Sequence, residues 1–214
     1  MKFKIADIRK DYSKKKLNVN TMDKDPIVQF EHWLEEAIEA DLPEPTAMCL
    51  STVDPHGQPS TRMVLLKGIR QGKLFFYTNY NSQKSKELEK NPRCSVTIYW
   101  PELERQVNIT GSVNRVDNQT SDEYFQSRPW KSQVGAWASP QSEPINSRSV
   151  IMVNFARYSA KYLGQEVPRP PHWGGFTIYP QIINFWQGRP NRLHDRFKYT
   201  RQNSGTWRIE RIAP

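Results

Sequence analysis

The sequence lacks the glycine-rich motifs that hold nucleotide phosphates with backbone amides. It contains neither a glycine–lysine phosphate loop nor a GxGxxG dinucleotide fingerprint, so any nucleotide must be held by side chains. Its histidines are scattered without ligand spacing, which disfavours a metal site. They are His32, His56, His172 and His194. No serine stands in a nucleophile-elbow motif, which disfavours a hydrolase of that type.

Long apolar segments and paired cysteines are also missing. No apolar run reaches the ~18 residues of a membrane span, and the N-terminus has no apolar signal core. Cys49 and Cys94 both lie in apolar runs, which is typical of buried thiols in a reducing compartment. The sequence therefore predicts a cytoplasmic protein with no membrane partner.

Basic residues are plentiful. The 214 residues include 31 Lys and Arg against 22 Asp and Glu, a net charge of +9. This balance predicts attraction to anions, which could be nucleic acid, acidic lipid or small phosphate esters. The hydrophobic content of 36% is modest, so we expect a second subunit to complete part of the core.

The apolar pattern predicts a mainly β fold with flanking helices. Residues 1–24 are polar and basic and are expected to form a mobile arm, followed by a single domain over 25–214. Asp25 and Pro26 begin a helix over 26–40. Other helices are expected over 82–90, 120–127 and 144–162. Short runs with turn signals predict a barrel or sandwich. The expected strands are 46–53, 60–69, 74–78, 93–100, 105–116, 176–179 with 182–186, 196–201 and 206–212, with a loop over 168–175.

One cationic turn lies between two strand-like runs near the C-terminus. Arg189, Arg192 and Arg196 accompany His194 and Asp195, shortly after the aromatic pair Phe185 and Trp186. Arginine forks bind phosphate or carboxylate, and histidine titrates near neutrality. The aromatic wall beside them favours a planar, phosphorylated ligand. The alternative is a solvated basic loop.

Three further clusters pair anion-binding side chains with aromatic residues. Taken singly, a strand with charged ends and an ordinary helix N-cap are the more common explanations for the first two, so the recurrence of such clusters carries the argument. Ser82 and Lys84 open a helix, where backbone N–H groups favour a phosphate. The clusters are Arg62 with Lys67, Ser82 with Lys84, and Tyr124 with Arg128 and Ser132; Gln106, Gln141, Ser142 and Trp186 add further donors.

Taken in order, these motifs resemble the pyridoxine (pyridoxamine) 5′-phosphate oxidase family. The resemblance covers nearly the whole chain from about residue 26, and residues 143–165 match less closely. It rests on the segments RMVLLK (62–67), FYTN (76–79), YW (99–100), ERQV (104–107), YFxSRP (124–129), GAW (135–137), PQS (140–142), EVP (166–168), WGG (173–175), the cationic turn, and WRIERIAP (207–214).

The resemblance implies an FMN-binding split β-barrel that works as a homodimer, with flavin sites at the subunit interface. It implies oxidation of pyridoxine 5′-phosphate or pyridoxamine 5′-phosphate to pyridoxal 5′-phosphate, while O2 is reduced to H2O2. Such chemistry needs positioning of the two rings more than a strong base, because the flavin supplies the redox step.

The resemblance also implies roles for individual residues. Arg192 and His194 would be catalytic, fixing the substrate ring over the flavin. The FMN set is Arg62, Met63, Val64, Leu65, Leu66, Lys67, Tyr77, Thr78, Gln83, Lys84, Gln106, Gln141, Ser142, Trp186 and Arg196. The substrate set is Lys67, Tyr124, Arg128, Ser132, Arg192, Leu193 and His194. The chain departs from the family at Gln83, where an arginine is usual, and this puts one contact to the FMN phosphate in doubt.

Three hypotheses stay open beside this interpretation. The first is another flavin split-barrel reductase, which the substrate set from Tyr124 to Ser132 disfavours. The second is a basic β-barrel that binds nucleic acid, which would place its charges along one continuous groove. The third is an additional site for pyridoxal 5′-phosphate in the N-terminal segment, formed by Arg9, Lys10, Asp11 and Tyr12.

Overall fold

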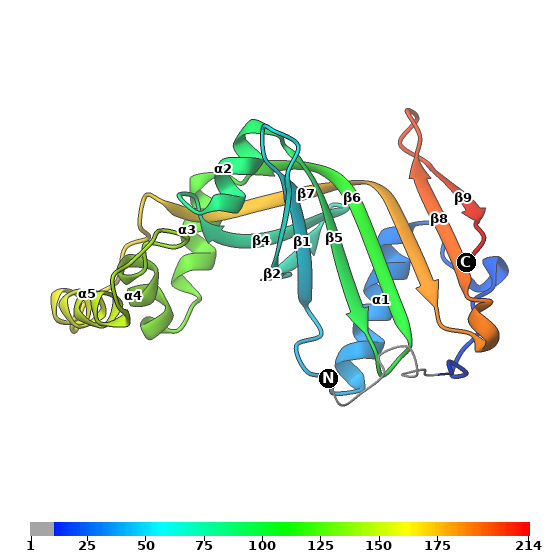
Figure 1. Cartoon of the computed structure of the whole chain (residues 1–214), viewed down its shortest axis with the longest axis horizontal. Helices are drawn as coiled ribbons and strands as arrows, with labels where there is room; N and C mark the ends of the chain where they lie inside the picture. The colour runs from blue at the N-terminus through cyan, green and yellow to red at the C-terminus, as the bar shows by residue number, and fades with distance from the viewer. Residues whose placement is uncertain (1–10) are drawn as a thin grey trace. The chain divides into compact units, whose positions relative to one another are not determined.

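The computed structural model describes residues 11–214 and shows a mainly β protein with flanking helices (Figure 1), which confirms the predicted fold class. None of the helices within this range is long and apolar enough to cross a membrane. The strands are β1 (Ala47–Val53), β2 (Pro59–Leu65), β3 (Gly68–Arg70), β4 (Lys73–Asn79), β5 (Arg93–Trp100), β6 (Arg105–Arg115), β7 (Trp173–Gln187), β8 (Asp195–Arg201) and β9 (Trp207–Arg211). The helices are η2 (Val19–Thr21), α1 (Pro26–Glu39), α2 (Gln83–Lys90), α3 (Asn118–Gln126), α4 (Trp130–Ala138), α5 (Arg148–Lys161) and η3 (Pro190–Arg192).

The described chain divides into two compact units. Unit 1 contains the described part of residues 1–49 with 95–110 and 180–214, and unit 2 contains 50–94 and 111–179. The strand order is β2-β1-β5-β6-β7-β4-β3, and β8 pairs with β7 and β9. The single domain expected over 25–214 stays a prediction.

The structure differs from the expected elements at four places. The loop expected over 168–175 is shorter, because β7 begins at Trp173. The strand expected over 60–69 is two strands, because the chain breaks at 66–67, where the Lys67 N–H donates to the Phe75 carbonyl at 2.8 Å. The runs 176–179 and 182–186 are parts of one strand, β7. Pro180 lies where the partner strand changes, because β4 pairs with residues up to Ile178 and β8 pairs from Ile182 onward.

The fourth difference is helix α4, which the sequence pattern does not predict. Pro129 lies at its N-cap, and its short apolar pattern alone is ambiguous.

In unit 1, helix α1 packs against the strands through aromatic side chains. The Asp25 carboxylate caps the helix by accepting from the Ile27 N–H at 2.9 Å. Phe30 stacks on Trp100 with ring centroids 6.4 Å apart, and Trp33 meets Phe185 edge-on at 5.1 Å. These buried contacts hold β5 and β7 beneath the helix and so position the turn that follows β7.

In unit 2, helices α3, α4 and α5 surround a second aromatic core. Figure 1 shows α4 and α5 side by side. The core residues are Phe125, Val134, Tyr162, Val167 and Trp173. Because Phe125 is on α3, Val134 on α4 and Trp173 opens β7, this core fixes the two helices against the sheet.

Candidate functional site

A cavity of about 590 Å³ opens in unit 2 between β4 and helices α3 and α4. Residues predicted to bind FMN and residues predicted to bind the substrate both line this cavity. They are Leu65, Lys67, Tyr77, Thr78, Tyr124, Arg128, Ser132 and Gln141. The fold therefore brings together residues up to 76 positions apart in the chain, from Leu65 to Gln141.

Three parallel aromatic rings form one wall of the cavity. Tyr77 and Tyr124 stack with centroids 3.8 Å apart, and Trp173 continues the stack 5.7 Å from Tyr77. Burial raises the pKa of the Tyr124 hydroxyl, so this group remains protonated at neutral pH and can donate a hydrogen bond.

Arg128 packs against this aromatic wall, and one of its guanidinium nitrogens has no hydrogen-bond acceptor within residues 11–214. Its guanidinium carbon is 4.6 Å from the centre of the Trp173 ring. Its Nη1 atom is buried and has no hydrogen-bond partner within residues 11–214. A buried unpaired donor is costly, so this nitrogen is suited to an acceptor oxygen on a ligand.

A second cation, Lys84, lies at the other predicted phosphate position. Its Nζ donates to Gln141 Oε1 at 2.9 Å, Ser82 Oγ at 3.0 Å and Thr78 Oγ1 at 3.1 Å. Burial, with the nearby charge of Arg62, lowers the pKa of Lys84 to about 8. No carboxylate in the described range lies within ion-pair distance of it, so the lysine is suited to an anionic ligand.

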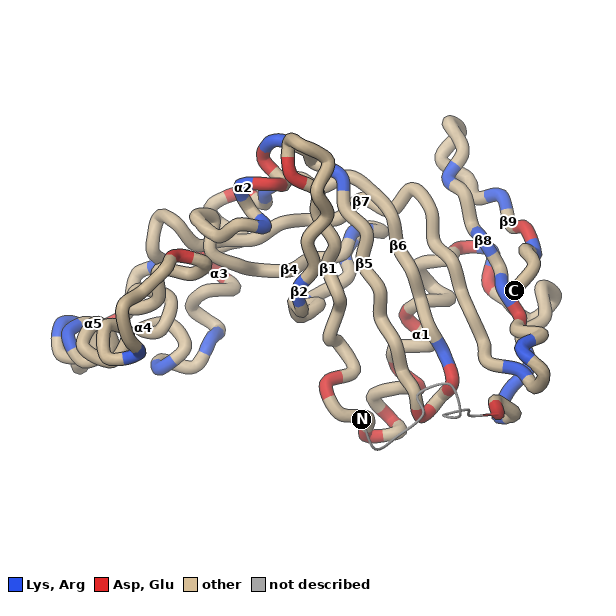
Figure 2. The backbone as a smooth tube through the Cα atoms, in the orientation of Figure 1, with Lys and Arg blue, Asp and Glu red and all other residues tan. Residues whose placement is uncertain are grey.

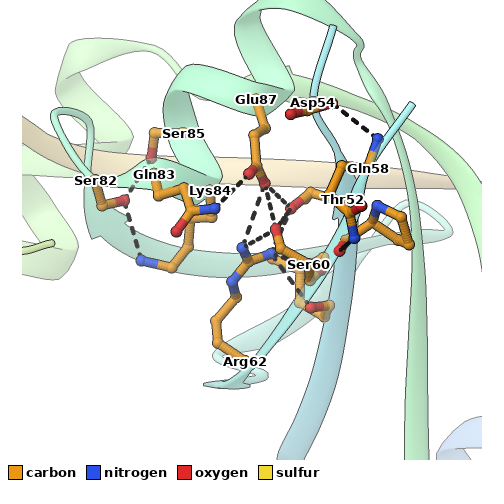
Figure 3. A network of polar contacts seen from close by, with 12 residues as sticks. Thr52, Asp54, Gln58, Ser60, Arg62, Ser82, Gln83, Lys84, Ser85 and Glu87 are labelled. Carbon is orange, nitrogen blue, oxygen red and sulfur yellow. Dashed lines mark hydrogen bonds and ion pairs between the residues drawn. The ribbon is translucent and has the colours of Figure 1, made fainter. Parts of the chain in front are cut away.

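Arg62 is held differently from Lys84. Figure 3 shows its guanidinium directed toward Glu87, Thr52 and Ser60. Nη2 is 3.3 Å from Glu87 Oε2 and 2.7 Å from Ser60 Oγ, and Nη1 bonds to Thr52 Oγ1. This cation therefore has a carboxylate partner in the protein.

Gln83 joins the same network. Its amide Nε2 donates to Glu87 Oε1 at 2.8 Å, one helical turn further along α2. The side chain is thus tied to a carboxylate rather than extended from the helix N-terminus. Its predicted contact to a cofactor phosphate stays a prediction.

Other residues of the predicted FMN set lie around these groups. Met63 and Leu65 are exposed on β2, whereas Leu66 is buried. Val64 lies between them, half-buried. Ser142 is exposed next to Gln141 and has a positive φ of 70°.

In unit 1 the cationic turn forms a separate cluster. Basic residues gather along β8, β9 and the turn before β8 (Figure 2). The His194 ring lies 4.8 Å from Trp186, and Tyr12 meets both rings edge-on at 5.7 and 5.5 Å. Gly188 permits this arrangement, because a Cβ there would lie 2.7 Å from Tyr12.

Four more predicted residues lie in unit 1. Arg192 is exposed with a left-handed φ of 62°, and Leu193 is exposed beside it. Arg196 Nη1 donates to the Ala213 carbonyl at 3.1 Å, and Gln106 donates to Asn108 Oδ1 at 2.7 Å. Trp186, Arg192, Leu193, His194 and Arg196 are therefore near neighbours along one turn.

The N-terminal segment is described only from residue 11, so Arg9 and Lys10 of the predicted second site lie outside the described residues. Ser13 and Lys14 donate backbone N–H groups to Glu104 at 2.9 and 3.0 Å. Leu17 N–H donates to Asp195 at 3.1 Å. Mobility of residues 1–24 stays a prediction, since contacts in one structure do not measure motion.

Two residues that sequence reasoning missed are central to the site. Glu87 is buried on α2, and no local signal separates it from the exposed Glu89 two positions on. Trp173 opens the WGG segment (173–175), but its role depends on its contact with Arg128, which is 45 residues away in the chain.

Comparison with known proteins identifies the family. Residues 34–162 match the family described as pyridoxamine 5′-phosphate oxidase, and residues 173–214 match the pyridoxine 5′-phosphate oxidase C-terminal dimerisation region. The chain belongs to the pyridoxamine 5′-phosphate oxidase family. The expected family, and the expectation of an enzyme, are confirmed.

Named relatives match this chain over nearly its full length and over nearly their own. A pyridoxine/pyridoxamine 5′-phosphate oxidase of Bacteroides thetaiotaomicron is 51% identical over 98% of this chain and 99% of its own. One from Chromobacterium violaceum is 52% identical over 100% of both chains.

Solved structures agree on the fold. PhzG from Burkholderia lata 383, in complex with tetrahydrophenazine-1-carboxylic acid, has a TM-score of 0.86 at 28% identity, over 91% of this chain and 95% of its own. A pyridoxamine 5′-phosphate oxidase-related, FMN binding protein from Nostoc punctiforme has a TM-score of 0.70 at 18% identity, over 90% and 100% of the two chains. The fold is that of the FMN-binding split barrels.

Proposed function

We propose that this chain is an FMN-dependent oxidase that converts pyridoxine 5′-phosphate or pyridoxamine 5′-phosphate to pyridoxal 5′-phosphate. One observation carries the proposal: a single cavity is bordered by two separate groups of polar side chains. One group is Thr78 and Gln141, which line the cavity and accept hydrogen bonds from the buried Lys84 behind them, and the other is Arg128 with Tyr124 and Ser132. Two such groups suit two phosphorylated ligands, a cofactor and a substrate.

The residues fit the phosphate of FMN at the first group. Lys84 is buried without a carboxylate partner in the described part of the chain, and it lies just inside the N-terminus of α2. The helix dipole adds to its attraction for an anion. FMN held there would supply the two-electron redox chemistry that couples oxidation at substrate C4′ to reduction of O2 to H2O2.

The second group would hold the substrate phosphate. Arg128 offers its unpaired Nη1, and the protonated Tyr124 hydroxyl donates beside it. The alcohol substrate loses two electrons and two protons in becoming the aldehyde. The amine substrate also takes up water and releases ammonia.

Residues of unit 1 have proposed roles as well. Arg192 and His194 would orient the substrate ring, and Leu193, between them in the chain, would also contact the substrate. Trp186, Gln106 and Arg196 would contact the cofactor. We propose a homodimer, supported by the match of residues 173–214 to a dimerisation region and by exposed apolar side chains such as Met63 and Val153. A cytoplasmic location remains part of the proposal.

The test is direct. Purified protein should be yellow, release FMN on denaturation and consume O2 with either phosphorylated vitamer, forming one H2O2 per pyridoxal 5′-phosphate. Unphosphorylated pyridoxine and pyridoxamine are the matched control substrates, and we expect much lower activity with them. Protein that binds no flavin after addition of FMN, or that retains flavin but oxidises neither vitamer, would refute the proposal.

A further inference from the structure

The carboxylate of Glu87 is buried beside the proposed cofactor phosphate position, yet it has no role in the reaction as proposed. The residue is 5% exposed. Its Oε2 atom accepts from Ser60 Oγ at 2.7 Å, from Arg62 Nη2 at 3.3 Å and from the Thr52 hydroxyl, and its Oε1 accepts from Gln83 at 2.8 Å. Four donors, from strands β1 and β2 and from the preceding turn of its own helix, therefore converge on one side chain.

Besides their direct ion pair, Glu87 and Arg62 are linked through two bridging hydroxyl groups. The Thr52 and Ser60 hydroxyls each donate to the carboxylate and accept from the guanidinium (Figure 3). Each hydroxyl has one donor proton and two acceptor lone pairs, so both roles are available at once. The ion pair is thus braced on both sides, and its geometry is set by β1 and β2.

This bracing leaves one edge of Arg62 available. Both terminal nitrogens bond to protein acceptors, which include the Leu50 and Ser60 carbonyls at 3.4 and 3.3 Å. Within residues 11–214, no acceptor lies in hydrogen-bond range of Nε. Arg62 pairs with Glu87, which follows Lys84 by three residues on α2, so Glu87 and Lys84 lie on the same face of that helix.

We propose that Glu87 is a positioning residue for the cofactor phosphate, which holds Arg62 through Thr52 and Ser60 so that the guanidinium is fixed beside Lys84. This inference rests on the proposed function. Gln83 belongs to the same hydrogen-bond network. Its neutral amide donates to the second oxygen of the Glu87 carboxylate and so helps to orient it.

Glu87 could influence FMN binding either through its negative charge or through its positioning of Arg62, and the two roles predict opposite effects of substitution. As a negative charge it would repel a phosphate, so its neutralisation would tighten binding. As a positioning residue it prepays the cost of ordering Arg62, so its displacement weakens binding. A variant that moves the carboxylate but retains the charge separates the two.

The experiment compares Glu87→Asp with Glu87→Gln in the full chain after removal of bound flavin. Each protein is titrated with FMN and with riboflavin, which lacks the phosphate, and binding is followed by quenching of flavin fluorescence. Glu89→Asp is the matched control, because Glu89 is an exposed glutamate on the same helix that pairs with Arg115. We expect Glu87→Asp to raise the FMN dissociation constant about tenfold, the loss of roughly one charge-assisted hydrogen bond, with riboflavin binding unchanged.

Thr52→Val and Ser60→Ala remove the two hydroxyls that bridge Glu87 and Arg62 without changing any charge. They provide the test if the Glu87→Asp variant does not fold. Each is expected to weaken FMN binding several-fold and to leave riboflavin binding unchanged. The inference is overturned if the Asp, Val and Ala variants that fold all bind FMN like the parent, or if they weaken FMN and riboflavin equally. Tighter FMN binding by Glu87→Gln with a silent Glu87→Asp would show that the carboxylate acts by charge alone. A parent protein that binds neither flavin would instead refute the proposed function.

Discussion

The Nδ1 atom of His194 accepts a hydrogen bond from the backbone N–H of Arg189 at 3.1 Å. Because Nδ1 is the acceptor, the neutral ring carries its proton on Nε2. Burial, together with the charge of Arg192, lowers the pKa of His194, which favours this neutral form at pH 7. The turn therefore presents a ring of defined tautomer and orientation, which suits a positioning role.

Arg192→Ala and His194→Ala should lower turnover far more than they lower FMN affinity. Both side chains are assigned to the substrate, and loss of positioning costs roughly 100-fold in rate. Steady-state kinetics and an FMN titration of the same preparations measure the two effects. Arg201→Ala, on the neighbouring hairpin, is the control. A variant that loses flavin but retains normal turnover per bound flavin would show that the role is misassigned.

FMN affinity should fall as the pH rises above about 8. Burial, with the charge of Arg62, lowers the pKa of Lys84 to about 8, and a bound phosphate dianion would raise that pKa. Binding is therefore strongest where the lysine is already charged, and it weakens by up to about tenfold per pH unit above 8. Titrations from pH 6.5 to 9.5 with FMN and riboflavin measure the slope. Lys84→Arg should flatten it; an unchanged slope in that variant would assign the effect to another group.

Arg128→Met should stabilise the ligand-free protein while it abolishes efficient turnover. The substitution removes a buried donor without a partner in the described chain and retains an apolar side chain on the Trp173 ring. We expect a gain of about 1 kcal/mol in the free energy of unfolding and a large rise in KM for both vitamers. Denaturant unfolding and kinetics measure the two effects, with Arg128→Lys as the charge-retaining control. A loss of stability would contradict the idea that this nitrogen awaits a ligand.

Gln83→Arg should tighten FMN binding several-fold, more at low salt, and leave turnover of the saturated enzyme unchanged. A guanidinium forms stronger hydrogen bonds to phosphate than an amide does, by about 1 kcal/mol. Part of the gain will be lost, because the residue at 83 also contacts Glu87. Equal FMN dissociation constants for the two forms would show that position 83 does not contact the phosphate.

Removal of residues 1–20 should weaken any product inhibition that is not competitive with substrate, if Arg9 to Tyr12 bind pyridoxal 5′-phosphate at a second site. Tyr12 also contacts His194 and Trp186, so the deletion should change the substrate KM as well. A shorter deletion of residues 1–10 separates the effects. Unchanged inhibition after both deletions would exclude the second site.

Local patterns in the sequence were sufficient for the class of fold and for most elements. The Asp25–Pro26 cap and the apolar spacing after it determine α1, and alternating side chains determine strands such as β1 and β5. Ordered motifs from Arg62 to the C-terminus were sufficient to identify the family. Caps, periodicity and motif order all depend on residues close together in the chain, which is why they are readable without a structure.

Tertiary structure alone decided which of these side chains have partners. Arg62 and Lys84 look alike in the sequence, but within residues 11–214 only Arg62 pairs with a carboxylate, from a residue 25 positions away. Glu87 and Glu89 also read alike, but the helix turns one toward the buried network and the other toward solvent. Burial and long-range pairing set the charge, pKa and free donors of a site, and neither is encoded in local periodicity.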